Sequence, residues 1–150
     1  MAVLAWGGMN IEFAPLTAGT PGTYTALDKK PVLDSFNLDS DDGDELKAQY
    51  EGGDIADYKR LANQPYIEFD RFVEKGTAKP IPDNDGVVTS EYAIRVIPED
   101  TTLEGRQMPR CTVSVKELWK SADGIKLHYT FRGMKPATGN VLQPYTAPQA

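Results

Sequence analysis

The chain has 150 residues, 40% of them apolar, which allows one domain with a packed core and excludes wholesale disorder. Sixteen basic and 22 acidic side chains leave a formal charge of -6, which argues against the basic surface of a nucleic-acid-binding protein. A single cysteine, Cys111, excludes an internal disulfide scaffold, and no apolar run approaches the roughly 20 residues of a membrane-spanning helix. The first residues, MAVLAWGGMNIEF, lack the basic start and long apolar run of a signal peptide, so synthesis in a cytoplasm is expected.

The first thirteen residues are expected to be extended, with a bend at the pair Gly7-Gly8. Residues 15–43 differ, because prolines, glycines and small polar side chains replace any apolar period. They predict a long loop with one or two short elements, and a loop of that length is usually functional or held by a partner. Three side chains in it are candidate anchors on a neighbouring subunit: Tyr24, Leu33 and Phe36.

The segment from Glu45 to Arg60 alternates on both sides of Gly52-Gly53, which is typical of a β-hairpin. A helix over 44–62 is the alternative, because Glu, Leu, Lys and Ala favour helix. Each glycine would cost such a helix about 1 kcal/mol, so the hairpin is favoured.

Strands and turns then alternate to the end of the chain. Strands are expected within 64–75, 87–100, 111–119 and 125–132, and the segments between them are expected to be turns or loops, at 79–86, 101–110 and 121–124. One turn of helix is possible at 116–123, and the Pro-rich tail, 137–150, is expected to be extended. Seven or eight strands without a long helical period predict an all-β, mainly antiparallel sandwich or barrel, formed by a single domain over residues 1–150.

The stretch ADGIKLHYTFRGMKP gives the clearest strand pattern. One parity is apolar (Ile125, Leu127, Tyr129, Phe131), and the other is polar (Lys126, His128, Thr130, Arg132). The apolar parity is predicted to pack in the core with side chains from three other strands: Val113, Val115, Tyr92, Ile94, Ile67 and Phe69.

No motif points to catalysis. His128, the one histidine, lies on a polar parity, and Cys111 lies on an apolar parity, where a small buried hydrophobe is expected rather than a nucleophile. The acidic run 39–45 fails the register of an EF-hand calcium loop, so a solvated turn is favoured over an irregular metal site. Phosphate loops, zinc spacings and nucleophile elbows are absent from the sequence, so no enzyme activity, cofactor or metal is predicted.

Four blocks of the sequence resemble the tail tube proteins of phages or prophages of Bacteroides-type bacteria. They are MAVLAWGGMNIEF, ELKAQYEGGDIADYKRLANQPYIEFDRF, PIPDNDGVVTSEYAIRVIPED and RCTVSVKELWKSADGIKLHYTFRGMKPATG. The resemblance spans most of the chain except about 15–43. It implies a β-sandwich or barrel whose copies form stacked rings, hexameric in this family, around the path by which the genome leaves the virion.

The resemblance also implies the partners and the location. Copies of the chain would bind one another and other virion proteins in the virion tail, and no membrane would be involved. The chain would be synthesised in the cytoplasm of the bacterial host. DNA would pass only as cargo that does not adhere, which suits a negative balance of charge. The candidates for a lumen-facing surface are acidic residues of the central block: Glu45, Glu51, Asp54, Asp57, Glu68 and Asp70.

Three other classes of protein stay open. A head–tail connector or a capsid decoration protein would share the sequence features. A monomeric β-sandwich binding module would use Trp6, Trp119 or Tyr145 as a stacking platform, although core or interface packing is favoured for these rings. An enzyme on a β scaffold would need a cleft of convergent titratable groups, which the sequence does not predict.

Overall fold

The structure, a computed structural model, describes residues 8–27, 30–32, 35–76, 78–100, 102–122 and 124–146, and no helix occurs among them. The all-β, antiparallel class predicted from the alternating pattern is confirmed. The strands are β1 (Met9–Thr17), β2 (Thr20–Pro21), β3 (Thr25–Ala26), β4 (Asn37–Asp41), β5 (Glu45–Gln49), β6 (Ile55–Arg60), β7 (Gln64–Phe72), β8 (Tyr92–Pro98), β9 (Gly105–Lys120), β10 (Gly124–Gly133) and β11 (Gln143–Tyr145).

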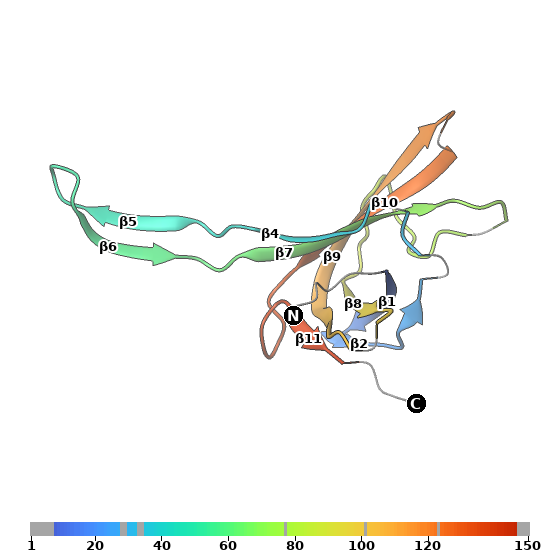
Figure 1. Ribbon diagram of the computed structural model, residues 1–150, viewed down its shortest axis with the longest axis horizontal. Helices are drawn as coiled ribbons and strands as arrows, with labels where there is room; N and C mark the ends of the chain where they lie inside the picture. The colour runs from blue at the N-terminus through green and yellow to red at the C-terminus, as the bar shows by residue number, and fades with distance from the viewer. Residues whose placement is uncertain are drawn as a thin grey trace, which may run out of the picture.

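Nine strands form one antiparallel sheet that curls into a half-barrel (Figure 1). The strand order is β2-β1-β8-β9-β10-β7-β4, with β3 paired to β1 and β11 paired to β9. β9 joins the two halves, because its first part pairs with β8 and β11 and its second part pairs with β10. β5 and β6 form a separate two-stranded sheet that projects far from this body.

The core lies on the concave side of the curled sheet, and β10 supplies its centre. Leu127, Tyr129 and Phe131 are buried, whereas Arg132 on the other parity is exposed, as the alternation predicted. Each fully buried side chain of this size contributes about 1.5–3 kcal/mol through burial of apolar area. The predicted partners are confirmed in the same buried cluster, with Tyr92 packed at its edge: Ile67, Phe69, Ile94, Val113 and Val115.

Residues 15–43 are more regular than the sequence predicted. β1 continues to Thr17, because Pro15 still pairs with Tyr92 and its carbonyl accepts a hydrogen bond from the Gly22 N–H at 2.9 Å. β2, β3 and β4 follow within the same segment. The prediction of a long loop with one or two short elements was therefore wrong in extent. Gly7 lies outside the described residues, so the expected bend there is not described.

The loop predicted at 101–110 was wrong for its second half. β9 begins at Gly105, and its first residues pair with β8 on one edge and with β11 on the other. The turn of helix considered at 116–123 was also wrong, because residues 116–120 pair with the start of β10. Pairing with a neighbouring strand satisfies the backbone groups that a helix would have satisfied internally.

The hairpin predicted around Gly52-Gly53 is confirmed, and the alternative helix over 44–62 is wrong. Gly52 and Gly53 have φ angles of 96° and 98°, a region that residues with a Cβ rarely adopt. The turn between β5 and β6 therefore depends on both glycines.

Candidate functional site

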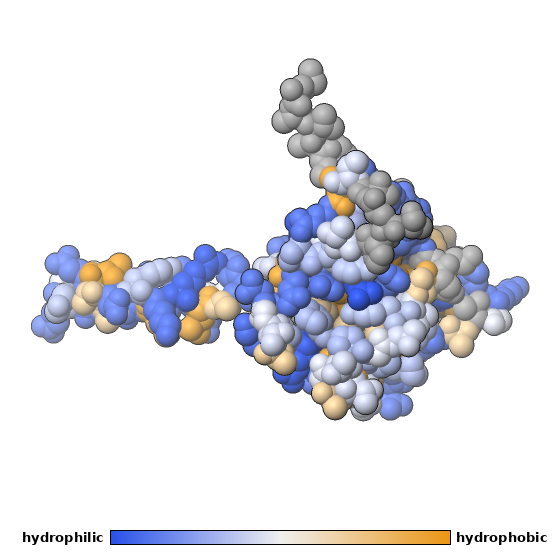
Figure 2. Space-filling view, turned by 90° about the horizontal axis from the view of Figure 1, so that it is seen from below, coloured by the Kyte–Doolittle hydropathy of each residue, from blue (hydrophilic) through white to orange (hydrophobic). Residues whose placement is uncertain are grey.

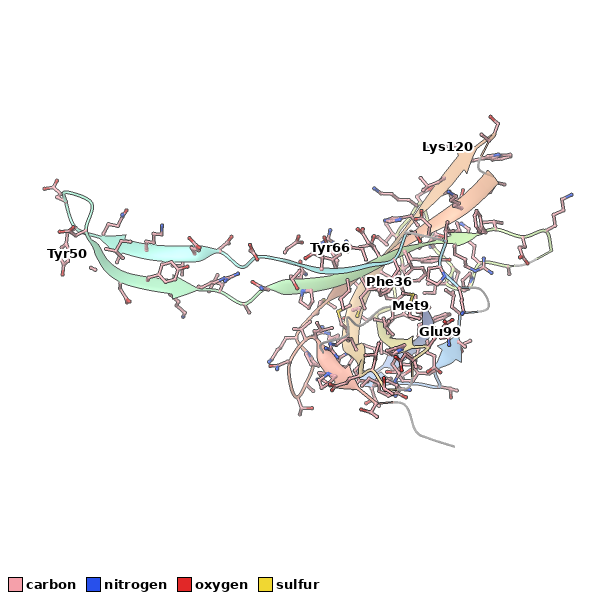
Figure 3. All side chains as sticks on the ribbon, in the orientation of Figure 1. Met9, Phe36, Tyr50, Tyr66, Glu99 and Lys120 are labelled. Atoms are coloured by element: carbon pink, nitrogen blue, oxygen red, sulfur yellow. The ribbon has the colours of Figure 1, made fainter. Side chains whose placement is uncertain are left out.

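Residues 42–63 form an extension that we call the arm. It contains β5, β6 and their turn, and every side chain of both strands is exposed. Among the described strands, β5 and β6 pair only with each other. At about 3.3 Å per residue, the nine residues from Asp42 to Tyr50 reach about 30 Å beyond the body. Figure 3 shows Tyr50 at the far end of the arm.

A compact junction fixes the base of the arm. The Gly43 N–H donates to Asn63 Oδ1 at 3.1 Å, and the Leu61 N–H donates to the Asp44 carbonyl at 2.9 Å. Arg60 Nη2 lies 3.2 Å from Asp42 Oδ1 and 3.1 Å from the same Asn63 oxygen. The two strands therefore leave the body in a defined register.

Replacing Gly43 with alanine is expected to open this junction. A Cβ at this position would lie 2.0 Å from the Leu61 carbonyl oxygen, far inside contact distance, and that neighbour is backbone. The expected result is faster amide exchange at Leu61, with the melting temperature of the body nearly unchanged because the core is distant. Hydrogen exchange measured by NMR tests this, and protection at Leu61 equal to the parent's would contradict it.

The arm carries large apolar side chains that no described part of its own chain covers. Tyr50 is 68% exposed, and four more apolar residues of the arm are at least 41% exposed: Leu46, Ile55, Tyr58 and Leu61. Figure 2 shows hydrophobic residues alternating with hydrophilic ones along the arm. A two-stranded ribbon of this kind is marginally stable alone in water, and uncovered apolar surface usually marks an interaction site.

A second uncovered surface lies at the other end of the molecule. Residues 72–76 and 116–126, of which Asp123 is not described, form what we call the overhang, where β7, β9 and β10 run past the core. Trp119 is 77% exposed there, and it lies outside the core. Figure 3 shows Lys120 at the tip of this hairpin, on the opposite side of the body from Tyr50.

The six candidate lumen residues do not form one surface. Glu45, Glu51, Asp54 and Asp57 lie on the arm, whereas Glu68 and Asp70 lie on the outer face of β7. His128 of β10 sits between that second pair, with Nδ1 2.5 Å from Asp70 Oδ1 and Nε2 3.4 Å from Glu68 Oε2. Whether either group faces a lumen stays a prediction.

The sheet's outer face carries both signs of charge. Arg132 pairs with Asp41 of β4 at 2.8 Å, and Lys116 and Lys126 share the face with His128. Acidic side chains gather on β4 and β7, and basic ones on β9 and β10. The sequence predicted the polar parity of each strand but not this division between neighbouring strands.

Two of the three proposed loop anchors, Tyr24 and Phe36, contact their own chain. Arg95 lies over the ring of Tyr24, 3.5 Å from its centroid, and over that of Tyr145, at 4.5 Å. Burial raises the pKa of Tyr24 above its ordinary value. Phe36 packs against the core, and Leu33 lies outside the described residues, as does Trp6. A role for Tyr24 and Phe36 in contacts between subunits stays a prediction.

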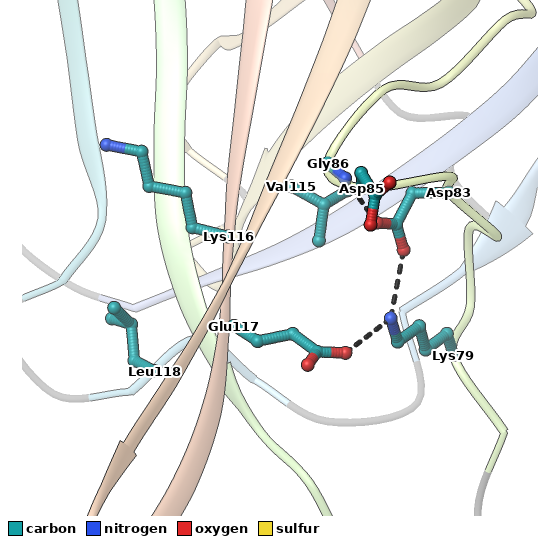
Figure 4. A pocket seen from close by; sticks show the side chains of 8 residues that line it. All are labelled: Lys79, Asp83, Asp85, Gly86, Val115, Lys116, Glu117 and Leu118. Carbon is teal, nitrogen blue, oxygen red and sulfur yellow. Dashed lines mark hydrogen bonds and ion pairs between the residues drawn. The ribbon is translucent and has the colours of Figure 1, made fainter.

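A polar groove lies beside β9. It measures about 480 Å³ (Figure 4) and is lined by Lys79, Asp83, Asp85, Gly86 and residues 115–118. Lys79 Nζ bridges Asp83 Oδ1 at 3.0 Å and Glu117 Oε1 at 2.6 Å, and these hydrogen bonds raise the pKa of Lys79 to about 12. Asp83 also accepts from the Gly86 N–H at 2.9 Å. These contacts hold the loop against β9, and the charged groups satisfy one another as hydrogen-bond partners.

Replacing Asp83 with asparagine is expected to lower the melting temperature by about 2–4 °C at pH 7. The Lys79 ammonium lowers the pKa of the Asp83 carboxyl, with help from the Gly86 N–H. A lowered folded-state pKa stabilises the protein above the unfolded value of about 4, and that stability is lost as pH falls through the folded-state value. The difference between parent and variant should therefore shrink below pH 4. Thermal melts from pH 2.5 to 8 test this, and a gap that persists at low pH would contradict it.

Among the described residues, the groups capable of catalysis or metal binding do not converge. Cys111 is fully buried, as predicted, and burial raises the pKa of its thiol, so it is a poor nucleophile. Across the described ranges, no three side chains among His, Cys, Asp and Glu are grouped to hold a metal ion. The same ranges contain no helix long and apolar enough to span a bilayer.

No family model matches the chain, and no curated protein matches it. The functional inference therefore rests on the arm, the overhang and the sheet.

Proposed function

We propose that the chain is a structural subunit of a virion, whose copies form stacked rings of a phage tail tube through which the genome passes. The observation that carries this proposal is the arm. A chain that folds only as a monomer gains nothing from an exposed ribbon with five large apolar side chains. Contact with another copy would cover that ribbon and offset the entropy of ordering it.

The body of the protein supports the same function. A curled antiparallel sheet presents one broad outer face, and such faces and strand edges can line up between neighbouring copies. The chain's formal charge of -6 would limit adhesion of DNA to a tube built from it.

A monomeric binding module is the alternative that a specific observation favours. Trp119 is 77% exposed, and an exposed indole can stack on a ligand such as a sugar ring. A head–tail connector or a capsid decoration protein would also use an arm of this kind, but in a different place in the virion.

Sedimentation velocity across a range of concentrations separates these functions. A ring-forming subunit should shift from a 16.5 kDa species to a discrete larger species as concentration rises. A binding module should remain near 16.5 kDa throughout, and that result would contradict the proposal.

A further inference from the structure

We infer that the overhang is the surface on which the arm of a second copy of this chain docks. This inference rests on the proposed assembly and adds to it the surface that binds the arm. The occupant is a neighbouring arm, with its apolar side chains against the overhang and its acidic side chains near the overhang's lysines.

The overhang has an apolar inner face that the core leaves bare. Trp119 lies opposite Ile125 across β9 and β10, and the Val73 N–H donates to the Ile125 carbonyl at 3.0 Å. These three residues continue the parity that is buried further along the same strands, where Leu127 and Phe69 lie in the core. The sheet therefore extends its core-forming face into solvent at this end.

The outer face of the overhang is also partly apolar. Phe72, Lys126 and Leu118 lie side by side across β7, β10 and β9. The Lys126 ammonium is 5.6 Å from the centroid of the Phe72 ring. The outer face of the overhang thus combines apolar contact area with a nearby positive charge, which suits a partner that is apolar and acidic.

The charges of the two surfaces are complementary. The arm carries six acidic and three basic side chains over residues 42–63. The overhang, residues 72–76 and 116–126, carries four basic and three acidic ones, against the negative balance of the whole chain. Opposite potentials steer association and disfavour the pairing of two arms or of two overhangs.

The positions of the two surfaces set the symmetry of the contact. The arm and the overhang project from opposite sides of the body, so one chain cannot cover its own overhang (Figure 1). Docking the arm of one copy on the overhang of the next is a head-to-tail contact, which generates a closed ring or an open helical array.

A mixing experiment tests the inference. One variant, Leu46→Lys with Tyr58→Lys, has a defective arm and an intact overhang. The other, Trp119→Asp with Lys126→Glu, has an intact arm and a defective overhang. All four side chains lie outside the buried core, so each variant should fold with the parent's circular dichroism and melting temperature. Val87→Asp, at an exposed apolar residue outside both surfaces, is the matched control.

Each variant alone is expected to need about tenfold or more protein than the parent to assemble. A mixture of the two should form a discrete 1:1 heterodimer by sedimentation velocity and native mass spectrometry, because one native arm meets one native overhang and further growth is blocked. The Val87→Asp control should assemble like the parent.

Two results would overturn the inference and leave the proposed function standing. In the first, the overhang variant assembles like the parent. In the second, each variant fails alone and the mixture gives no heterodimer, which would place the docking site of the arm elsewhere. A parent that stays monomeric at every concentration would instead overturn the proposed function, and this inference with it.

Discussion

Replacing Phe131 with alanine is expected to lower the free energy of unfolding by about 3–5 kcal/mol, the range for removing a buried aromatic ring. Phe131 is 0% exposed, and its ring stacks on Phe69 with centroids 6.0 Å apart and planes 15° apart. It pairs across the sheet with Val113 and Ile67, so the cavity would open between three strands. The backbone of all three strands is held by the ladder, which limits how far the site can collapse.

Thermal and urea melts of the isolated subunit measure this effect. At about 2–4 °C per kcal/mol for a chain of this length, the midpoint should fall by roughly 10 °C. Thr130→Ala, one residue away on the outer face, is the matched control and should shift the midpoint little. A Phe131→Ala variant that melts like the parent would show that β10 does not supply the centre of the core.

Replacing Leu46 and Tyr58 with lysine is expected to abolish assembly while leaving the subunit folded. The two side chains lie on opposite faces of the arm, because Leu46 pairs with Lys59 and Tyr58 pairs with the adjacent Lys47. Both are about half exposed, so their loss removes no contact of the core. The substitutions also cancel part of the arm's negative charge, which weakens electrostatic steering towards a basic partner.

Light scattering and melting curves together measure this second effect. The variant should scatter as a monomer at concentrations where the parent assembles, and its midpoint should lie within about 2 °C of the parent's. Val87→Lys makes the same kind of change on the body and should assemble normally. Assembly of the arm variant at the parent's concentration would show that the arm is not an interface.

The sequence predicted the fold best where one side of a strand is buried. Residues 127–132 alternate because one face meets the core and the other faces outward, and that period of two can be recognised in the sequence. The same argument found β7, β8 and the second part of β9. It also found the turn at Gly52-Gly53, because few residues other than glycine accept its backbone angles.

Local turn chemistry misled the prediction elsewhere. Pro15 and Pro109 suggested loops, yet both lie within strands whose neighbours supply the remaining hydrogen bonds. β4 has a single large apolar side chain, Leu38, and it exists because it pairs with the edge of β7. A strand that forms by pairing rather than by burial leaves little pattern in its own sequence.

Only part of the candidate site could be predicted from the sequence. The alternation of residues 45–60 predicted a hairpin but could not show that the hairpin leaves the body, because a period of two says nothing about what covers each face. Trp119 was expected in core or interface packing. The structure excludes the core, since β9 runs past it, and the interface stays a prediction. The pairing of His128 with Asp70 depends on the register of two strands 58 residues apart.

Negative-stain electron microscopy of the concentrated, purified protein tests the proposed function most directly. Rings with a central channel, hexameric and stacking into tubes as concentration rises, are the expected result. Particles that remain single 16.5 kDa subunits at the highest concentration would contradict it.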